Sequence, residues 1–390
     1  MTAAVAQRLG GLPQGLLRNP NAVAAVVLLF AAALLPLFYA QASGFIDDAT
    51  TALAFVVMAL GLNVVVGFAG LLDLGYVAFY AIGAYTVGWF GSSFFNAVNG
   101  GEGVHIGVSA AGQLPGIHLN FLLILLLAAA ICAAAGALIG IPTLRLRGDY
   151  IAIVTLAFGE IIRLFAVNGD ELKLGDYRLT QGRQGITPVD KPDLPFADPF
   201  TSLNLRPWYW TILALVALVL FVNFRLRDSR LGRAWIAVRE DEVAAASMGV
   251  PLVRTKLLAY ATGAAFGGFA GTFLASFQNT VNADQFEFSF SIFALAMVIL
   301  GGLGSIWGVV VGAVALSFIN TNLIPDVLAP RARDVFGGGF DLTELSFGIF
   351  GFLLVIMMVL RPQGLLPERR RQAELTEGLA TDEAVYDARA

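Results

Sequence analysis

Apolar runs of about twenty residues or more recur along this 390-residue chain and are separated by polar segments. A bilayer core of about 30 Å requires roughly 20 apolar residues in helical conformation, so each run is long enough to cross a membrane. The runs assigned to spans are 22–40, 49–95 (two spans), 118–141, 149–167, 208–224, 257–278, 290–321 (two spans) and 343–360. The pattern predicts an all-α, polytopic transmembrane helical bundle of about ten spans.

Glycines interrupt two of these apolar runs and predict broken helices. The first interruption, at 67–75, combines three glycines with Asp73, and the second lies at 301–308. Irregular backbone inside a bilayer must be covered by protein or must line a water-filled cavity. The two breaks occupy similar places in the two halves of the chain, which indicates an internal repeat with a transport route at its interface. For Asp73 a second interpretation stays open, namely a tight turn at the inner surface with its carboxylate in water.

Basic residues are concentrated in a few of the polar segments and therefore predict the orientation. The segment 225–256 carries seven Arg or Lys against four acids, and Arg145 and Arg147 lie in another short loop. Loops rich in Arg and Lys stay in the cytoplasm, so both loops and both termini are expected inside. The loop 168–206 is expected outside, although its own mixed charges give no orientation signal. The predicted divisions are a cytoplasmic tail at 1–20, a transmembrane domain at 21–365 and a disordered cytoplasmic tail at 366–390.

The interior of segment 225–256 has the pattern of a folded element. Apolar side chains recur in it at helical spacing, at Trp235, Val238, Ala245 and Met248. The acidic cluster at 240–242 suits a helix N-terminus, and Gly249 followed by Pro251 forms a helix stop. We predict that a partner protein grips this segment and moves the attached spans. The residues assigned to this coupling surface are Arg233, Trp235, Arg239, Glu240, Asp241, Glu242 and Gly249.

Few polar side chains lie within or beside the apolar runs. Glu160 and Arg163 are three residues apart, so they share a helix face and can pair. Counted from Asp149, Glu160 lies about 16 Å deep, where charges face the protein interior or a cavity. We expect either a structural ion pair or a role in a transport pathway. The intramembrane polar candidates are Asn63, Asp73, Tyr76, Glu160 and Arg163.

The composition and the missing motifs exclude several classes of function. The chain is 57% hydrophobic and only 13% charged, whereas soluble domains carry about 25% charged residues. No lysine follows a glycine, so a Walker A loop is absent, and neither an HExxH nor a GxSxG sequence occurs. We expect no catalytic residue, no metal site and no cofactor on this chain. A passive channel or an externally powered permease fits better than a membrane-embedded enzyme.

Five stretches of the chain occur in an order that matches one protein family. They are GLNVVVGFAGLLDLGYVAFYAIGAYT (61–86), LRLRGDYIAIVTLAFGEIIRL (144–164), GITPVDKP (185–192), GRAWIAVREDEVAAASMGV (232–250) and ALAMVILGGLGSIWGVVVGA (294–313). With them the sequence resembles the LivM-type membrane subunit of bacterial ATP-binding-cassette importers for branched-chain amino acids. Leu71 and Asp73 match this type, whereas the sister subunit usually has Gln and Ser there. One departure is Arg183, which stands where the family's LTGGPNGI motif has proline.

The resemblance implies a division of labour among several proteins. A periplasmic or lipid-anchored binding protein would capture the amino acid, and a homologous permease subunit would form the pathway together with this chain. Two cytoplasmic ATPase subunits would bind around 225–256 and consume the ATP. The resemblance also implies a multi-pass protein of the bacterial cytoplasmic (inner) membrane with no nucleic-acid partner. The substrates leucine, isoleucine and valine rest on the resemblance alone. The alternatives are another small solute, such as urea or a short-chain amide, or a passive channel.

Overall fold

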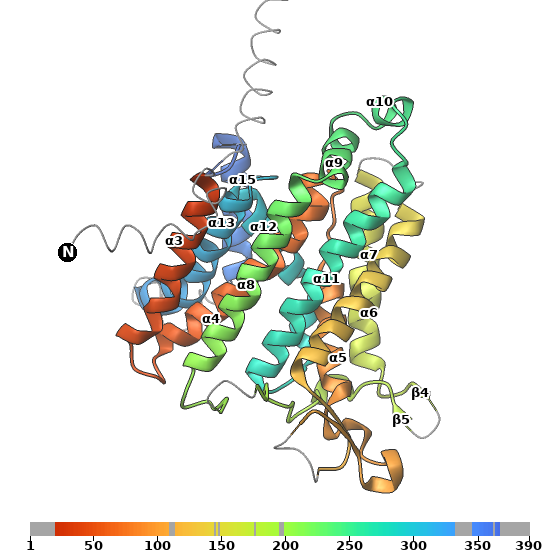
Figure 1. Cartoon of the computed structure of the whole chain (residues 1–390), viewed down its shortest axis with the longest axis vertical. Helices are drawn as coiled ribbons and strands as arrows, with labels where there is room; N and C mark the ends of the chain where they lie inside the picture. The colour runs from red at the N-terminus through yellow and green to blue at the C-terminus, as the bar shows by residue number, and fades with distance from the viewer. Residues whose placement is uncertain are drawn as a thin grey trace, which may run out of the picture.

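The computed structural model describes residues 20–108, 114–143, 146, 149–174, 177–194, 199–331, 345–361 and 363–366. Within these residues the chain is a bundle of helices with two small sheets at one end (Figure 1). Apart from Pro20 and Leu366, the predicted tails at 1–20 and 366–390 lie outside the described residues, as do Arg145 and Arg147.

The apolar helices of the bundle differ in length. Their bounds are α3 Pro20–Leu34, α4 Gly44–Asn63 with the π-helical extension η3 Val64–Phe68, α5 Val77–Phe90, α6 Phe121–Thr143, α7 Asp149–Asn168, α8 Arg206–Arg227, α11 Leu252–Gln278, α12 Phe288–Gly301, α13 Ile306–Phe318 with the π-helical extension η8 Ile319–Leu328, and α15 Ser346–Leu360. In the described part of the chain, six helices are long and apolar enough to cross a membrane, and four apolar helices are shorter. The prediction of an all-α, multi-pass membrane protein is confirmed at this level.

Among the described residues, five short strands lie outside the apolar helices, at the end of the bundle opposite α10 (Glu242–Ser247) (Figure 1). The strands are β1 Gly91–Ser92, β2 Val104–Ile106, β3 Ile117–Leu119, β4 Lys173–Leu174 and β5 Tyr177–Arg178. The first sheet has the order β1-β3-β2, with β2 parallel to β3, and β4 pairs with β5. The strictly all-α prediction missed these strands because they are only two or three residues long.

Helix α11 forms the centre of the bundle and lies against α4, α5 and α6. Its small residues permit this close packing. A Cβ added to Gly268 would lie 2.6 Å from the Cys132 sulfur on α6, and one added to Gly271 would overlap the Tyr80 carbonyl on α5. Small residues at such contacts let helices approach closely in a lipid environment.

Both predicted helix breaks are present, and they meet inside the bundle. The first follows η3, where Gly70 adopts a φ of +69° and residues 71–76 run irregularly to the start of α5. The second separates α12 from α13, where Gly304 has a φ of +82°. The Asn63 side-chain oxygen accepts a hydrogen bond of 2.9 Å from the Gly304 N–H, so one polar contact joins the two breaks.

Candidate functional site

Two short helices, α9 (Arg230–Glu240) and α10, form one tip of the molecule (Figure 1). The predicted helical spacing from Trp235 to Met248 covers both helices and not one continuous helix. Asp241 separates them because its carboxylate accepts hydrogen bonds from the first backbone N–H groups of α10, as an N-cap does. The predicted stop is confirmed, since Gly249 has a φ of +85° that favours glycine.

Internal contacts fasten these two helices to α11. The Trp235 side chain is fully buried, and its Nε1–H donates a 2.8 Å hydrogen bond to the Thr255 carbonyl. The buried Lys256 ammonium bonds to the Glu242 carboxylate at 2.7 Å. Trp235 and Glu242 therefore stabilise the packing of α9 and α10 on α11. A direct docking role for Trp235 is wrong because a fully buried ring has no surface free for a partner. Sequence reasoning missed Lys256, which had counted only as one of the basic residues of the segment.

Arg239 connects the coupling segment to the first helix break. Its guanidinium donates a 2.7 Å hydrogen bond to the Gly67 carbonyl and is paired with Glu240. A Cβ added to Gly70 would lie only 2.5 Å from the Arg239 Cγ. The Gly67 carbonyl attracts the Arg239 cation because a carbonyl at the end of a π-helical turn lacks a helical partner. A docking role of Arg239 toward a partner stays a prediction.

The exposed face of α10 is apolar and small. Val243 and Met248 are exposed to 65% and 86%, and Ala244 and Ala246 are exposed beside them. Met248, which the helical spacing groups with Trp235, therefore lies on the surface. Among the other predicted coupling residues, Arg233, Glu240, Asp241 and Gly249 are exposed. The tip thus presents an apolar patch with charged residues around it.

Asp73 lies deep in the protein, with only 1% of its surface exposed. Its Oδ1 accepts a 2.9 Å hydrogen bond from the Gly75 N–H, and its Oδ2 has no hydrogen-bond partner among the described residues. The interpretation that placed this carboxylate in water at the inner surface is therefore wrong. The Nδ2 of buried Asn63 likewise lacks a partner within the described chain.

Residues 73–76 are held between α7 and α11. The Leu74 N–H donates to the Thr155 hydroxyl on α7 at 3.0 Å, and the Tyr76 hydroxyl donates to the Gly263 carbonyl on α11 at 2.7 Å. Gly75 permits the contact with α7, because a Cβ there would overlap the Thr155 carbonyl. Of the predicted intramembrane candidates, Asn63, Asp73 and Tyr76 therefore gather around the first break.

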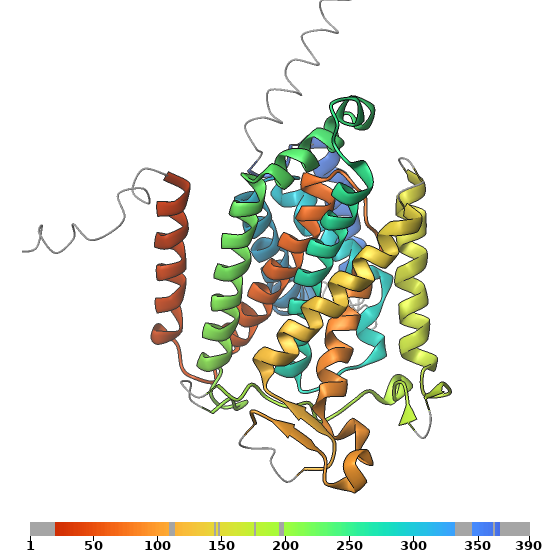
Figure 2. The same cartoon turned by 45° about the vertical axis from the view of Figure 1, so that its right-hand side comes forward.

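Glu160 and Arg163 lie on α7, which runs along one side of the bundle (Figure 2). They form the predicted pair at 3.6 Å, and Arg163 also lies 4.0 Å from Glu287. Their side chains are 37% and 28% exposed, so the pair is not buried within this chain. Charges on a membrane-spanning helix need protein or water around them.

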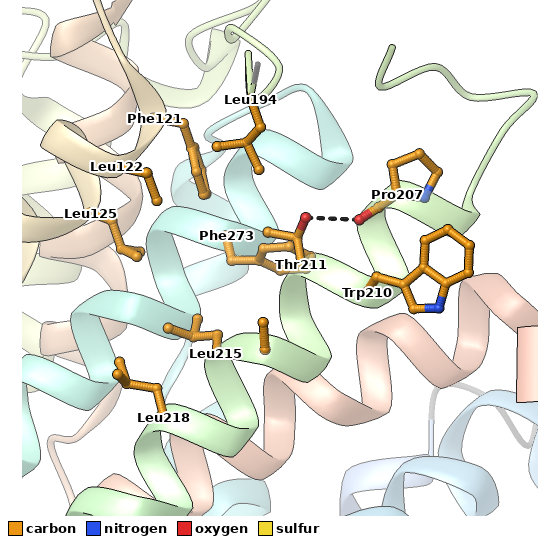
Figure 3. A pocket seen from close by; sticks show the side chains of 11 residues that line it. Phe121, Leu122, Leu125, Leu194, Pro207, Trp210, Thr211, Leu215, Leu218 and Phe273 are labelled. Carbon is orange, nitrogen blue, oxygen red and sulfur yellow. Dashed lines mark hydrogen bonds between the residues drawn. The ribbon is translucent and has the colours of Figure 1, made fainter. Parts of the chain in front are cut away.

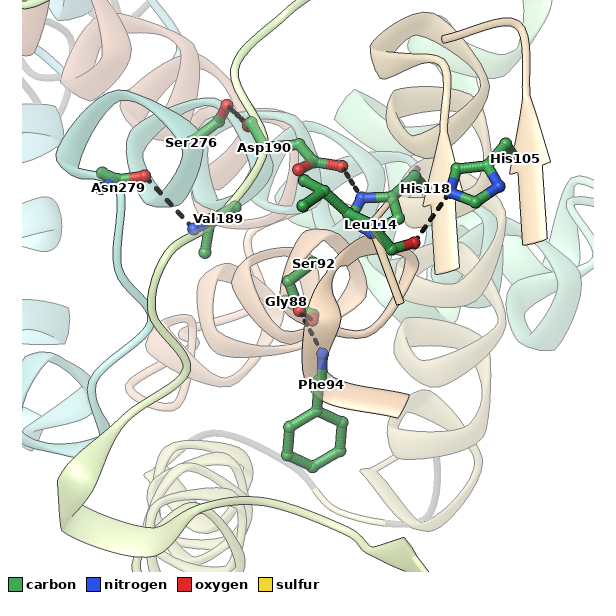
Figure 4. A network of polar contacts seen from close by, with 10 residues as sticks. All are labelled: Gly88, Ser92, Phe94, His105, Leu114, His118, Val189, Asp190, Ser276 and Asn279. Atoms are coloured by element: carbon green, nitrogen blue, oxygen red, sulfur yellow. Dashed lines mark hydrogen bonds and ion pairs between the residues drawn. The ribbon is translucent and has the colours of Figure 1, made fainter. Parts of the chain in front are cut away.

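The end of the molecule opposite α10 is organised by a polar network around Asp190 (Figure 4). The His118 Nδ1 on β3 lies 2.6 Å from the Asp190 carboxylate, and the Ser276 hydroxyl on α11 donates to the Asp190 carbonyl at 2.6 Å. These bonds hold the predicted outer loop 168–206 against the bundle while Arg183 stays exposed. No three His, Cys, Asp or Glu side chains in the described ranges are arranged to hold a metal ion.

An apolar groove beside these elements is lined mainly by hydrocarbon side chains. It has a volume of about 530 Å³ and lies between α6, α8 and α11 (Figure 3). Thr211 is its polar side chain, and the Thr211 hydroxyl donates to the Pro207 carbonyl of its own helix at 2.8 Å. A charged solute would find no partner there, whereas lipid chains would.

Comparison with known proteins agrees with this architecture. Residues 45–358 match the family model described as "Branched-chain amino acid transport system / permease component". The chain belongs to this family. It is 40% identical over 360 residues to the high-affinity branched-chain amino acid transport system permease protein LivM of Salmonella typhimurium, covering 87% of this chain and 74% of that protein.

Two further relatives place the chain within the permease component family. The LivM protein of Escherichia coli is 40% identical over 361 residues, again with 87% and 74% coverage. The LivH permease protein of Salmonella typhimurium is 26% identical over 336 residues, which is 82% of this chain and 93% of that protein. No solved structure matches the chain. The higher identity to LivM agrees with Leu71 and Asp73, the two positions of the first break that resemble the LivM type.

Proposed function

We propose that the protein is the transmembrane permease subunit of an ATP-binding-cassette importer for leucine, isoleucine and valine. Its place is the bacterial cytoplasmic (inner) membrane, with about ten spans and both termini inside. Membership of the permease family supports the class, and the identity to LivM proteins supports the substrate. The observation that carries the mechanism is the direct hydrogen bond between Arg239 of the coupling segment and Gly67 of the first break.

The exposed surfaces support the proposed partners. Two cytoplasmic ATPase subunits, which use the ATP, serve the importer, and the apolar patch of α10 offers the docking surface on this chain. A homologous permease subunit covers the half-exposed Glu160–Arg163 pair on α7. A periplasmic or lipid-anchored binding protein docks on the opposite end, where Arg183 is exposed. This chain itself has no catalytic role.

The internal contacts give a route for the motion. A push on α10 reaches α11 through the Glu242–Lys256 pair and through the hydrogen bond from Trp235 to Thr255. The same push reaches the first break through Arg239. Because α11 packs on α4, α5 and α6, its tilt moves the walls around Asn63 and Asp73. ATP binding and hydrolysis by the partners would thereby open and close the route at the two breaks.

Reconstitution tests this proposal. The chain is co-purified with its permease partner and ATPases, placed in proteoliposomes, and supplied with the binding protein and ATP. Accumulation of labelled leucine is expected, and accumulation of labelled urea is not. Leucine flux without ATP or ATPases would establish a passive channel, and accumulation of urea instead of leucine would refute the substrate assignment.

A further inference from the structure

A small pocket opens beside Glu287, where α11 ends and α12 begins. It has a volume of about 200 Å³, which is below the roughly 300–1,000 Å³ of pockets for drug-sized ligands. Its size therefore suits a molecule as small as a single amino acid. The pocket lies at the end of the bundle that the proposed topology places outside, where a binding protein would release its cargo.

The inner wall of the pocket is apolar and aromatic. The buried rings of Phe55 and Tyr80 lie against Phe290, with ring centroids 5.7 Å and 4.9 Å from that of Phe290. Buried Leu274 completes this wall. A branched aliphatic side chain placed here would exchange water for aromatic and aliphatic contacts, which is favourable.

The rim of the pocket carries the charges and amides that a zwitterion requires. Asp284 and Glu287 supply exposed carboxylates, which attract an ammonium group. The Gln285 amide N–H donates to the Gln278 side-chain carbonyl at 2.8 Å. This bond uses the carbonyl of Gln278, so the amide N–H₂ of Gln278 stays able to donate to a carboxylate.

We propose that this pocket is an entry site at which the permease holds one zwitterionic amino acid with a branched apolar side chain. The ammonium group lies between the carboxylates of Asp284 and Glu287, the carboxylate meets the Gln278 amide, and the side chain packs on Phe55, Tyr80 and Phe290. The next polar contact along α12 is the hydrogen bond of 3.0 Å from the Val77 N–H to the Ser291 hydroxyl. Val77 adjoins the segment that contains Asp73, so α12 carries residues of the pocket and also contacts the chain next to the first break. This assignment rests on the proposed function.

Direct binding of labelled leucine to the complete transporter complex in nanodiscs, without the binding protein, tests the site. The wild-type complex is expected to bind labelled leucine. Unlabelled leucine is expected to displace the bound label, whereas 4-methylpentanoate, which lacks the ammonium group, is not. Glu287→Gln is expected to weaken leucine binding by about tenfold or more, since it removes a charge-assisted contact. Phe290→Ala is expected to weaken leucine binding and to leave the discrimination against 4-methylpentanoate intact.

Asp47→Asn is the matched control. Asp47 lines a neighbouring groove of about 560 Å³ together with Lys191. This groove shares Gln278 with the pocket but includes neither Asp284 nor Glu287, and leucine binding is expected to be unchanged. The entry site is overturned if the wild-type complex imports leucine but does not bind it without the binding protein. It is also overturned if both pocket variants bind leucine like the wild type. Unchanged leucine binding with lost stimulation of ATP hydrolysis by the binding protein would show that Glu287 contacts that protein instead. Failure of the wild-type complex to import any branched-chain amino acid would refute the proposed function itself.

Discussion

Asp73 shows how a single side chain shapes the first helix break. One carboxylate oxygen holds the Gly75 N–H at 2.9 Å, and the other has no partner within the described residues. Asn at this position keeps an oxygen for Gly75 and removes the charge, whereas Leu removes both. The contribution of Asp73 to folding can therefore be separated from its contribution to transport.

Asp73→Leu is expected to lower the free energy of unfolding by about 1–3 kcal/mol, because the buried Gly75 N–H loses its acceptor. Asp73→Asn is expected to keep the wild-type melting temperature and to change the rate of leucine uptake. Thermal unfolding of the purified complex and uptake by proteoliposomes measure the two effects. Equal melting temperatures for both variants would contradict a structural role of the Asp73–Gly75 bond.

At the scale of elements, α9 and the first break move as one unit if the Arg239–Gly67 bond transmits force. Arg239→Gln is expected to leave co-purification of the ATPases unchanged and to reduce the number of leucine molecules imported per ATP hydrolysed. Arg233→Gln is the matched control, since the guanidinium of Arg233 is exposed and bonds to the Asp228 carbonyl near its own helix. If Arg239 were instead a docking charge, Arg239→Gln would release the ATPases, and the release would depend on salt.

The end of α10 depends on one backbone conformation and not on packing. Gly249 has a φ of +85°, and a Cβ at this position would meet no atom within 4 Å. Gly249→Val is expected to distort the end of α10 and to reduce the amount of ATPase that co-purifies, because β-branched residues resist positive φ. Gly249→Asn is expected to retain most of the co-purifying ATPase, since Asn tolerates a positive φ. Similar losses for both variants would show that the side-chain volume at the docking surface matters instead.

At the scale of the whole molecule, α10 and the first sheet lie at opposite ends of the bundle (Figures 1 and 2). Cysteine at Glu102, which is exposed beside β2, is expected to react with a membrane-impermeant maleimide in intact cells. Cysteine at Ser247, exposed on α10, is expected to react after the membrane is opened. The native thiol of Cys132 is buried and gives a low background. The reverse labelling pattern would invert the proposed topology.

The sequence by itself determined the class of the protein and the position of its breaks. Apolar runs near the length of a bilayer crossing predict spans, because an unpaired backbone cannot lie in lipid. Glycines predicted both breaks and the stop at Gly249, since the left-handed conformation observed at Gly70, Gly249 and Gly304 costs glycine little. The ordered motifs led to the permease family.

The tertiary structure alone decided what the side chains contact. The charge pattern counted Arg239 among the residues of a docking surface, but a free carbonyl at Gly67 turns it inward. Helical spacing treated Trp235 and Met248 alike, yet α11 buries Trp235, and Met248 projects past the end of α10. The pocket at Glu287 joins residues of α4 and α5 to residues of α11 and α12, two pairs of helices that are far apart in sequence. Local sequence cannot specify such contacts, because they depend on which helices pack together.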